Sequence, residues 1–180
     1  MNQFVDRMIR ASKLEAKLYE EVEADKGAMG QAMAVVVLSS LAAGIAAISV
    51  QGLGGLVIGT IVALVGWYVW AFLTYLIGTK LLPEPQTQAD HGQLLRTIGF
   101  SSAPGIIRII GIIPGLRSIV FLVGGIWMLA AMVIGVRQAL DYKSTGRAIG
   151  VCVIGWLIYL LIAGLLFALM GGAPGGSAPA

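Results

Sequence analysis

Four long apolar runs fill most of the chain between Met29 and Met170, and charged or proline-rich breaks separate them. An α-helix needs about 20 mainly apolar residues to cross a bilayer, and these runs have that length. A fifth, shorter apolar run over residues 103–113 contains Pro104 and Arg108. An ordinary soluble domain cannot bury so much apolar surface. The pattern therefore predicts a polytopic membrane protein.

The composition agrees with a membrane environment. Of the 180 residues, 58% are hydrophobic and 12% are charged, against about 45–50% and about 25% in typical globular domains. The net charge of +3 comes from loops and the N-terminal segment, which bears on topology and not on nucleic acid. Cys152 and His91 are the single cysteine and histidine. Haem or zinc ligation would need more partners, so no metal and no cofactor is expected.

The first 26 residues predict one amphipathic helix, within an N-terminal segment 1–28 that precedes the membrane domain. The pairs Asp6–Arg10 and Lys17–Glu21 are four residues apart, which suits helical charge pairs. Three roles are open for this helix: packing on the protein's own loops, lying on the membrane surface, or docking a partner. The apolar face recurs at three- and four-residue steps and consists of Phe4, Met8, Ala11, Leu14, Leu18 and Val22.

The expected fold class is all-α: a bundle of five transmembrane helices, residues 29–170, plus the amphipathic helix. The dipeptide Gln51–Gly52 predicts a tight turn and hence an antiparallel hairpin of the first two spans. Small residues let helices approach closely in lipid, so this hairpin is expected to pack along Gly55, Gly59 and Ala63. Residues 171–180 form a small, uncharged tail. The spans are expected at residues 29–50, 53–79, within 103–115, at 118–136 and at 148–170.

The third segment is unusual because two Pro–Gly breaks, at Pro104 and Pro114, flank Arg108. Broken backbone at membrane depth needs protein or a water-filled cavity to satisfy it. An arginine at mid-bilayer costs at least about 2.5 kcal/mol on insertion scales. Arg108 is therefore either a functional polar site or a snorkelling or structurally paired side chain. Whether 103–115 crosses the membrane or re-enters stays open. Before it, Asp90 with Gln93 three residues later predicts a capped short helix.

The basic residues predict the topology. Ten of the twelve lie in the N-terminal segment, the 80–102 region and the 137–147 loop, which share one side in a five-span arrangement. Cytoplasmic loops carry the excess of Lys and Arg. The N-terminus is therefore expected in the cytoplasm and the C-terminus outside it.

No catalytic constellation is present in the sequence, so an enzyme is not expected. The single histidine has no evident partner for a Ser/His/Asp set. The spans between Met29 and Met170 contain no acidic residue outside the polar loops. Ion-coupled transporters usually place such a carboxylate within a span, which argues against coupled transport.

The order of several elements resembles the Yip family. These elements are the stretch Leu94–Gly105, the pair Ile126–Trp127, and the run Arg137–Asp141 leading to Gly146–Ala148. The resemblance covers about residues 28–170. It implies a compact five-helix membrane domain with an inside N-terminus. Eukaryotic members act in vesicle traffic between endoplasmic reticulum and Golgi and bind Rab-type GTPases, whereas bacterial members are mostly of undefined role.

The chain departs from the eukaryotic pattern, because the cytosolic Asp-Leu-Tyr-Gly-Pro element is missing and the Gly-Tyr pair is Gly99–Phe100. A Rab-type GTPase partner is therefore doubtful. The short loops resemble the bacterial branch, which implies the inner (plasma) membrane.

Three functions are weighed. The favoured one is a non-enzymatic membrane protein that acts by association with a membrane protein partner, a second copy or lipid, in a membrane-organising or trafficking-type role. The second is a small transporter or channel using Arg108, and the third is an accessory subunit of a larger membrane complex. Arg108 and Arg96 are candidate lipid or partner contacts. The candidate partner surface is Arg137, Asp141, Tyr142, Lys143 and Arg147.

Overall fold

The computed structural model describes residues 2–169, apart from the side chains of residues 163, 166, 167 and 169. The expected tail, residues 171–180, lies outside the described residues. Every regular element within 2–169 is helical, which confirms the all-α class. Four helices are long and apolar enough to cross a membrane. They cover Lys26–Ala46, Ile48–Leu81, Arg117–Ala139 and Thr145–Ile162.

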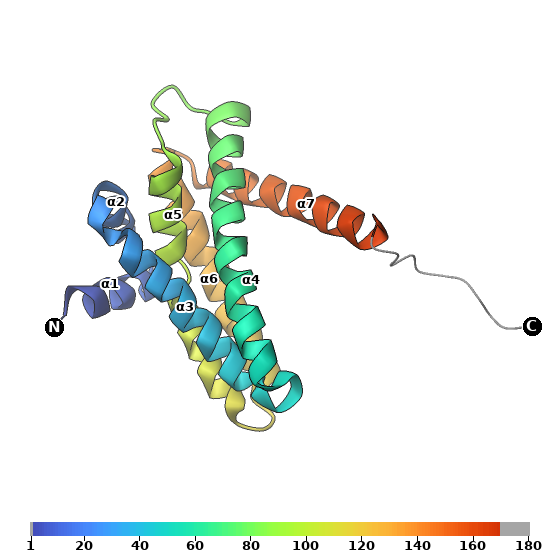
Figure 1. Cartoon of the computed structure of the whole chain (residues 1–180). Helices are drawn as coiled ribbons and strands as arrows, with labels where there is room; N and C mark the ends of the chain where they lie inside the picture. Colours follow the sequence, from blue (N-terminus) through green and yellow to red (C-terminus); the bar gives the residue numbers. More distant parts are fainter. Residues whose placement is uncertain (1, 170–180) are drawn as a thin grey trace, which may run out of the picture.

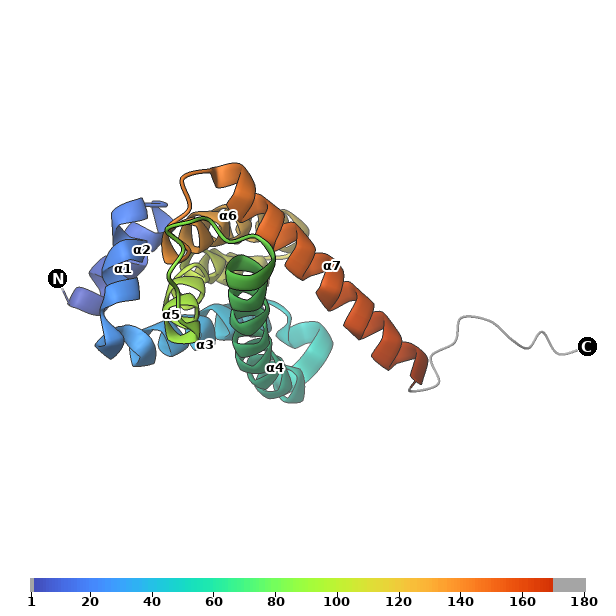
Figure 2. The same ribbon diagram turned by 90° about the horizontal axis from the view of Figure 1, so that it is seen from above.

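The helices α3, α4, α5 and α6 form an elongated bundle, and α7 leaves one end of it at a steep angle (Figure 1). The helices α1 and α2 lie against one side of the bundle, away from α7, as the view in Figure 2 also shows. The element bounds are α1 Gln3–Ser12, α2 Ala16–Ala24, η1 Lys26–Ala28, α3 Met29–Ala46, α4 Ile48–Leu76, η2 Ile77–Leu81, α5 His91–Phe100, η3 Ala103–Ile112, α6 Arg117–Ala139 and α7 Thr145–Leu169.

The N-terminal segment forms two helices where the sequence predicts one. Leu14 has φ 62°, and its N–H donates to the carbonyl of Ala11 while the N–H of Glu15 donates to that of Arg10. This pair of bonds is the Schellman arrangement that ends a helix. The apolar periodicity of the sequence continues through this turn, so the periodicity alone does not reveal that the helix ends here. Helices α1 and α2 are called the N-terminal layer below.

The predicted apolar face is nevertheless the buried one. Ala11, Leu18 and Val22 are fully buried, and Phe4 and Met8 pack against the same cluster. That cluster includes Phe100 of α5 and residues of α3, so the layer packs on the transmembrane-type helices themselves. At its edge the indole Nε1 of Trp127 in α6 donates to the carbonyl of Ser12, over 2.8 Å.

Helices α3 and α4 form the predicted antiparallel hairpin, but the reversal takes longer than the expected dipeptide. Helix α3 ends at Ala46, and the direction changes again at Gly52, whose φ of 65° favours glycine. The contact with α3 is made by Leu56, which packs on Gly44, and by Thr60, whose hydroxyl accepts a bond from Ser40.

The small residues expected in this contact face elsewhere. Gly55, Gly59 and Ala63 occupy the neighbouring stripe of α4 and line a groove. Because successive helical residues are offset by about 100°, burying Leu56 and Thr60 against α3 turns this stripe away from it. The hairpin prediction is therefore confirmed, whereas the predicted packing face is wrong.

The third segment runs from one end of the bundle to the other (Figure 1). Asp90 and Gln93 form the predicted capping box, with bonds of 2.8 and 2.6 Å. Helix α5 leads into the 3₁₀ helix η3, where Pro104 sits in the first turn without breaking the path. The second break is a real turn, since Gly115 has φ 86°. This turn lies beside the α3–α4 reversal.

The bundle therefore has two distinct ends. Residues 45–52 and 111–117 together form what is called the turn end. Residues 82–90 and 140–147 form the opposite loop end. The larger buried cluster lies toward the loop end, where Leu94 and Ile98 of α5 meet Leu140, Val151 and the ring of Tyr142.

Candidate functional site

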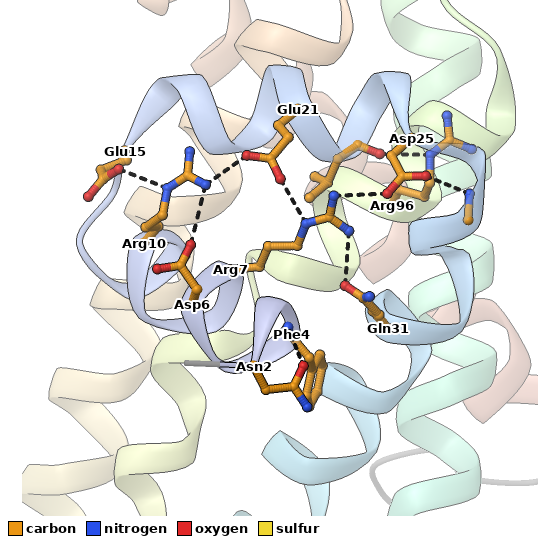
Figure 3. A network of polar contacts seen from close by, with 12 residues as sticks. Asn2, Phe4, Asp6, Arg7, Arg10, Glu15, Glu21, Asp25, Gln31 and Arg96 are labelled. Atoms are coloured by element: carbon orange, nitrogen blue, oxygen red, sulfur yellow. Dashed lines mark hydrogen bonds and ion pairs between the residues drawn. The ribbon is translucent and has the colours of Figure 1, made fainter.

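A polar network holds the N-terminal layer together (Figure 3). Arg7 is only 2% exposed, and its guanidinium bonds Glu21 at 2.9 Å, Asp25 at 2.8 Å and the side-chain oxygen of Gln31 at 3.0 Å. Arg10 adds a 2.7 Å bond to Glu21. The bond from Arg10 keeps the pKa of Glu21 below its usual value, and the bond from Arg7 does the same for the pKa of Asp25.

This network revises one predicted charge pair. Asp6 and Arg10 lie 3.5 Å apart as the four-residue spacing predicts. Glu21, however, contacts Arg7 and Arg10 instead of Lys17. The turn at Leu14 places α1 beside α2, so each carboxylate oxygen of Glu21 accepts a charge-assisted bond from a different arginine of α1.

Arg96 ties the layer to the bundle. It is 4% exposed, and its guanidinium donates to the carbonyls of Val22, at 2.8 Å, and Glu23. Both carbonyls belong to the last turn of α2, where the helix leaves acceptors without intrahelical donors. A cation is also favoured there by the helix dipole. Arg96, one of the predicted contact residues, is thus occupied by the protein's own backbone.

Carboxylates gather around Glu23 at the edge of the layer. Burial and the nearby charge of Asp141 raise the pKa of Glu23 to about 7, and Glu20 and Asp90 act in the same direction while Arg96 opposes them. The side chain of Glu20 also accepts a 3.2 Å bond from Gln138 of α6. The layer and the loop end therefore share one acidic border.

Two of the predicted site residues, Arg137 and Tyr142, stabilise the 140–147 loop through bonds to backbone carbonyls. Arg137 donates to the carbonyls of Tyr142 and Lys143, at 3.2 and 3.3 Å, and to the hydroxyl of Thr145 at 3.2 Å. Tyr142 is 3% exposed, and its hydroxyl lies 2.7 Å from the carbonyl of Leu82. Both side chains support the loop.

The same loop is joined to the 82–90 loop. The N–H of Lys143 donates to Glu84 at 3.2 Å, and Arg147 lies 3.3 Å from the other carboxylate oxygen. These contacts, with the N–H of Lys143 foremost, hold the pKa of Glu84 below its usual value. The side chains of Gln86 and Thr87 bond the carbonyls of Asp141, at 2.9 Å, and Leu140, at 3.0 Å.

Apart from Arg96, the predicted site residues fall into two places. Arg137, Asp141, Tyr142, Lys143 and Arg147 lie together at the loop end, where Asp141 and Lys143 are exposed and Tyr142 is buried. Asp141 has φ 53° and ends α6 in the same Schellman arrangement as Leu14 ends α1. Its position is explained by backbone geometry, which a short polar residue tolerates.

Arg108 lies apart from the others, on η3 in the half of the bundle toward the turn end. Its guanidinium donates to the carbonyl of Gly105 at 3.0 Å and to the hydroxyl of Ser39 at 2.8 Å. It borders a large groove between α4 and α6, with a volume of about 1360 Å³. Arg117, at the start of α6, borders the same groove.

Sequence reasoning missed Arg7 and Arg117 as residues of interest. Nothing in the spacing of Arg7 distinguishes it from the other basic residues of a helix assumed to be continuous. Arg117 follows the Pro114–Gly115 turn, and its place on the same groove as Arg108 depends on η3 and α6 meeting side by side. A basic residue two positions after a Pro–Gly turn in an apolar region was the available signal.

The helices, their apolar outer surfaces and the polar ends define a multi-pass membrane protein of the all-helical class. The chain matches the Yip1 domain over residues 16–173 and belongs to the Yip1 family. The resemblance noted in the sequence is thereby confirmed at the level of the family. Searches among curated proteins and among solved structures returned no match.

Proposed function

We propose that this protein acts by non-enzymatic association, using an exposed surface at the loop end to contact a membrane protein partner or a second copy. The surface consists of the exposed side chains of Lys17 and Glu20 in α2 and of Asp141 and Lys143 in the 140–147 loop. It has both signs of charge. That mixture suits specific pairing with a complementary surface more than general attraction to anionic lipid.

One observation carries this proposal: three separate segments are fastened into a single surface. Gln138 joins α6 to Glu20, and Gln86 and Thr87 join the 82–90 loop to the 140–147 loop. A surface whose backbone is already ordered loses less conformational entropy when a partner binds. The Yip1 family is associated with membrane traffic, a process that depends on contacts between proteins at the membrane.

We infer five spans with a cytoplasmic N-terminus, in the inner membrane of a bacterium. The four apolar helices support four of the spans, and the α5–η3 path over residues 91–112 supplies the fifth by its course between the two ends. Ten of the twelve basic residues then lie in the N-terminal segment, the 80–102 region and the 137–147 loop, which share one side in a five-span arrangement, as cytoplasmic segments require. The loop end is therefore assigned to the cytoplasm and the turn end to the opposite face.

Labelling from one side of sealed vesicles tests this topology. Cys152 is replaced by Ser, and single cysteines are placed at the exposed positions Ser144 and Ser118. In spheroplasts a membrane-impermeant maleimide should label Ser118→Cys and leave Ser144→Cys unlabelled until the cells are opened. Equal labelling of both positions in intact spheroplasts would contradict the five-span arrangement.

Association is tested by co-purification from native membranes in a mild detergent. The double variant Asp141→Lys/Lys143→Glu reverses two exposed charges and leaves Arg137 and Tyr142, which support the loop from inside, in place. It should lose a stoichiometric partner or the dimer that the wild-type protein retains. The matched control Ser118→Glu, at the other end of the bundle, should keep it. The proposal is contradicted if the double variant keeps the partner or the dimer. It is also contradicted if the wild-type protein shows neither a partner nor a dimer.

Two other functions remain as proposals. An accessory subunit would differ from the favoured function only because its association with other proteins is permanent. A complex of fixed stoichiometry that survives purification would indicate this role. A small transporter is favoured by one observation, namely Arg108 on the 3₁₀ helix η3 beside the groove. Anion flux in proteoliposomes that disappears in Arg108→Ala would support transport.

A further inference from the structure

Two arginines approach one aromatic ring near the turn end. The guanidinium carbon of Arg108 lies 5.8 Å from the ring centre of Phe121, and that of Arg117 lies 5.9 Å from it. The residues come from η3 and from the first turn of α6, respectively. All three side chains line the groove between α4 and α6.

Neither positive charge is balanced by a carboxylate. The side-chain acceptor of Arg108 is the neutral hydroxyl of Ser39, supplemented by the carbonyls of Ser39 and Gly105. No ion pair among residues 2–169 involves Arg108 or Arg117. This differs from Arg7, which contacts two carboxylates. The mouth of the groove is therefore a site of concentrated positive charge that an anion would complement.

The groove beyond this mouth is apolar and larger than most small-molecule pockets. Its volume is about 1360 Å³, against about 300–1,000 Å³ for typical ligand sites. Leu56, Trp67 and Met128 are among the side chains that line it. A free inorganic anion would leave this space unfilled, whereas a molecule with hydrocarbon chains would occupy it.

The depth of the two arginines also fits a lipid headgroup. Arg117 is the first residue of α6, at the turn end, and Arg108 precedes the end of η3 by four residues. A 3₁₀ helix rises about 2 Å per residue, so Arg108 lies only about 8 Å below that end. Long cationic side chains at this depth extend toward the headgroup layer.

We propose that Arg108, Arg117 and Phe121 form a binding site for the phosphate of an anionic phospholipid, whose acyl chains lie in the groove between α4 and α6. The lipid belongs to the leaflet at the turn end. This site is separate from the loop-end surface and does not depend on the function proposed for that surface. It would give the protein a preference among the lipids around it.

The test is native mass spectrometry of the full chain released from a neutral detergent after titration with phosphatidylglycerol or phosphatidylcholine. Wild type should retain one phosphatidylglycerol preferentially. Removing one charge-assisted contact in Arg117→Gln should weaken its retention about tenfold. The control Lys143→Gln changes an exposed basic residue at the loop end and should bind as wild type does. Retention of both lipids to the same extent would overturn the proposal.

A second variant tests the groove without altering any charge. Gly59 lines the groove, and a Cβ built there meets nothing within 4 Å, so Gly59→Leu is expected to fold and to obstruct the acyl chains. It should reduce phosphatidylglycerol retention while leaving both arginines in place. Unchanged retention in Gly59→Leu would overturn the placement of the chains.

The same spectra distinguish other occupants. Displacement of the lipid by millimolar inorganic phosphate would assign the arginines to free phosphate and overturn the lipid proposal. A dimer without bound lipid, lost in Gly59→Leu, would assign the groove to a second copy. A melting curve of Arg117→Gln that matches wild type excludes misfolding as the reason for lost binding.

Discussion

Arg7 and Arg96 are almost fully buried in the half of the molecule near the loop end, whereas Arg108 stays partly open to a groove in the other half. Arg7 contacts two carboxylates, and Arg96 contacts the last carbonyls of a helix. Arg108 has only neutral acceptors. Arginine is thus an internal tie in one half, whereas Arg108 keeps a positive charge with no carboxylate partner among residues 2–169.

Packing also differs between the contact of α5 with α3 and the groove. Near the loop end helices approach so closely that Gly99 of α5 has room only for hydrogen, since a Cβ would lie 2.7 Å from the Cβ of Ala32 and 3.1 Å from its carbonyl oxygen. In the groove, Gly59 of α4 and Gly125 of α6 have nothing within 4 Å. The contact between α3 and α5 at Gly99 is therefore closed, whereas the groove between α4 and α6 is open at Gly59 and Gly125.

The largest expected effect on stability comes from replacing one of these glycines with leucine. Gly99→Leu should cost about 3 kcal/mol or more, because the backbone of α3 must move to admit the side chain. Gly59→Leu should be neutral or stabilise by up to about 0.8 kcal/mol through helix propensity. Thermal unfolding in detergent, followed by loss of the monomer peak, compares the two. Equal losses of stability in both variants would contradict this difference between the α3–α5 contact and the groove.

The two kinds of arginine are compared by replacement with methionine. Arg7→Met should cost about 1–2 kcal/mol, because Glu21, Asp25 and Gln31 lose the donor that they share. Arg108→Met should change stability by less than about 1 kcal/mol, since it removes a cation that has no charged partner. The same melting assay applies. A larger loss in Arg108→Met than in Arg7→Met would show that the comparison is wrong.

Glu23 gives a pH dependence to the stability of the N-terminal layer. Its pKa of about 7 in the folded protein exceeds the ordinary value of 4.5, so the folded state binds this proton more tightly than the unfolded state does. Its contribution to stability is full below about pH 4.5 and is lost as the pH rises through 7. Glu23→Gln should therefore stabilise the protein by about 1–2 kcal/mol at pH 8 and hardly at all at pH 5.

Chemical denaturation of Glu23→Gln at both pH values measures this effect. The control is Glu15→Gln, which changes an exposed carboxylate of the same layer. If the gain in unfolding free energy is the same at pH 5 and pH 8, titration of Glu23 is not its source.

The smallest effect concerns the end of α6. Asp141 has a left-handed backbone conformation, which glycine adopts without strain, so Asp141→Gly should change stability by no more than about 1 kcal/mol and in the favourable direction. Asp141→Val should be destabilising, because a β-branched residue resists positive φ. The difference between the two variants in a melting curve tests the backbone explanation of Asp141.

Hydropathy, caps and turns were readable in the sequence because they depend on neighbouring residues. The hairpin of α3 and α4, the capping box of Asp90 and the buried face of the N-terminal layer are confirmed. The break at Leu14 was not readable, since a leucine in a left-handed conformation carries no signal of its own. Nor could the outward face of Gly59 be read, because it depends on which stripe of α4 packs on α3.

The site was harder to predict than the fold. Basic residues near span ends were identified, but their roles depend on partners far away in the chain, such as the carbonyl of Leu82 for Tyr142. Arg108 was recognised from its cost in an apolar segment. Its relation to Arg117 and Phe121 needed the packing of η3 against α6.

The bond from Trp127 to the carbonyl of Ser12 joins residues 115 positions apart. During synthesis the first two helices therefore leave the ribosome long before the surface that receives them exists. Their apolar face is covered in stages, first by residues of α3 and by Phe100 of α5, and only later by Ile134 and Trp127 of α6. Contacts of such high sequence separation form late, so the earliest part of the chain to be made is among the last to reach its final place.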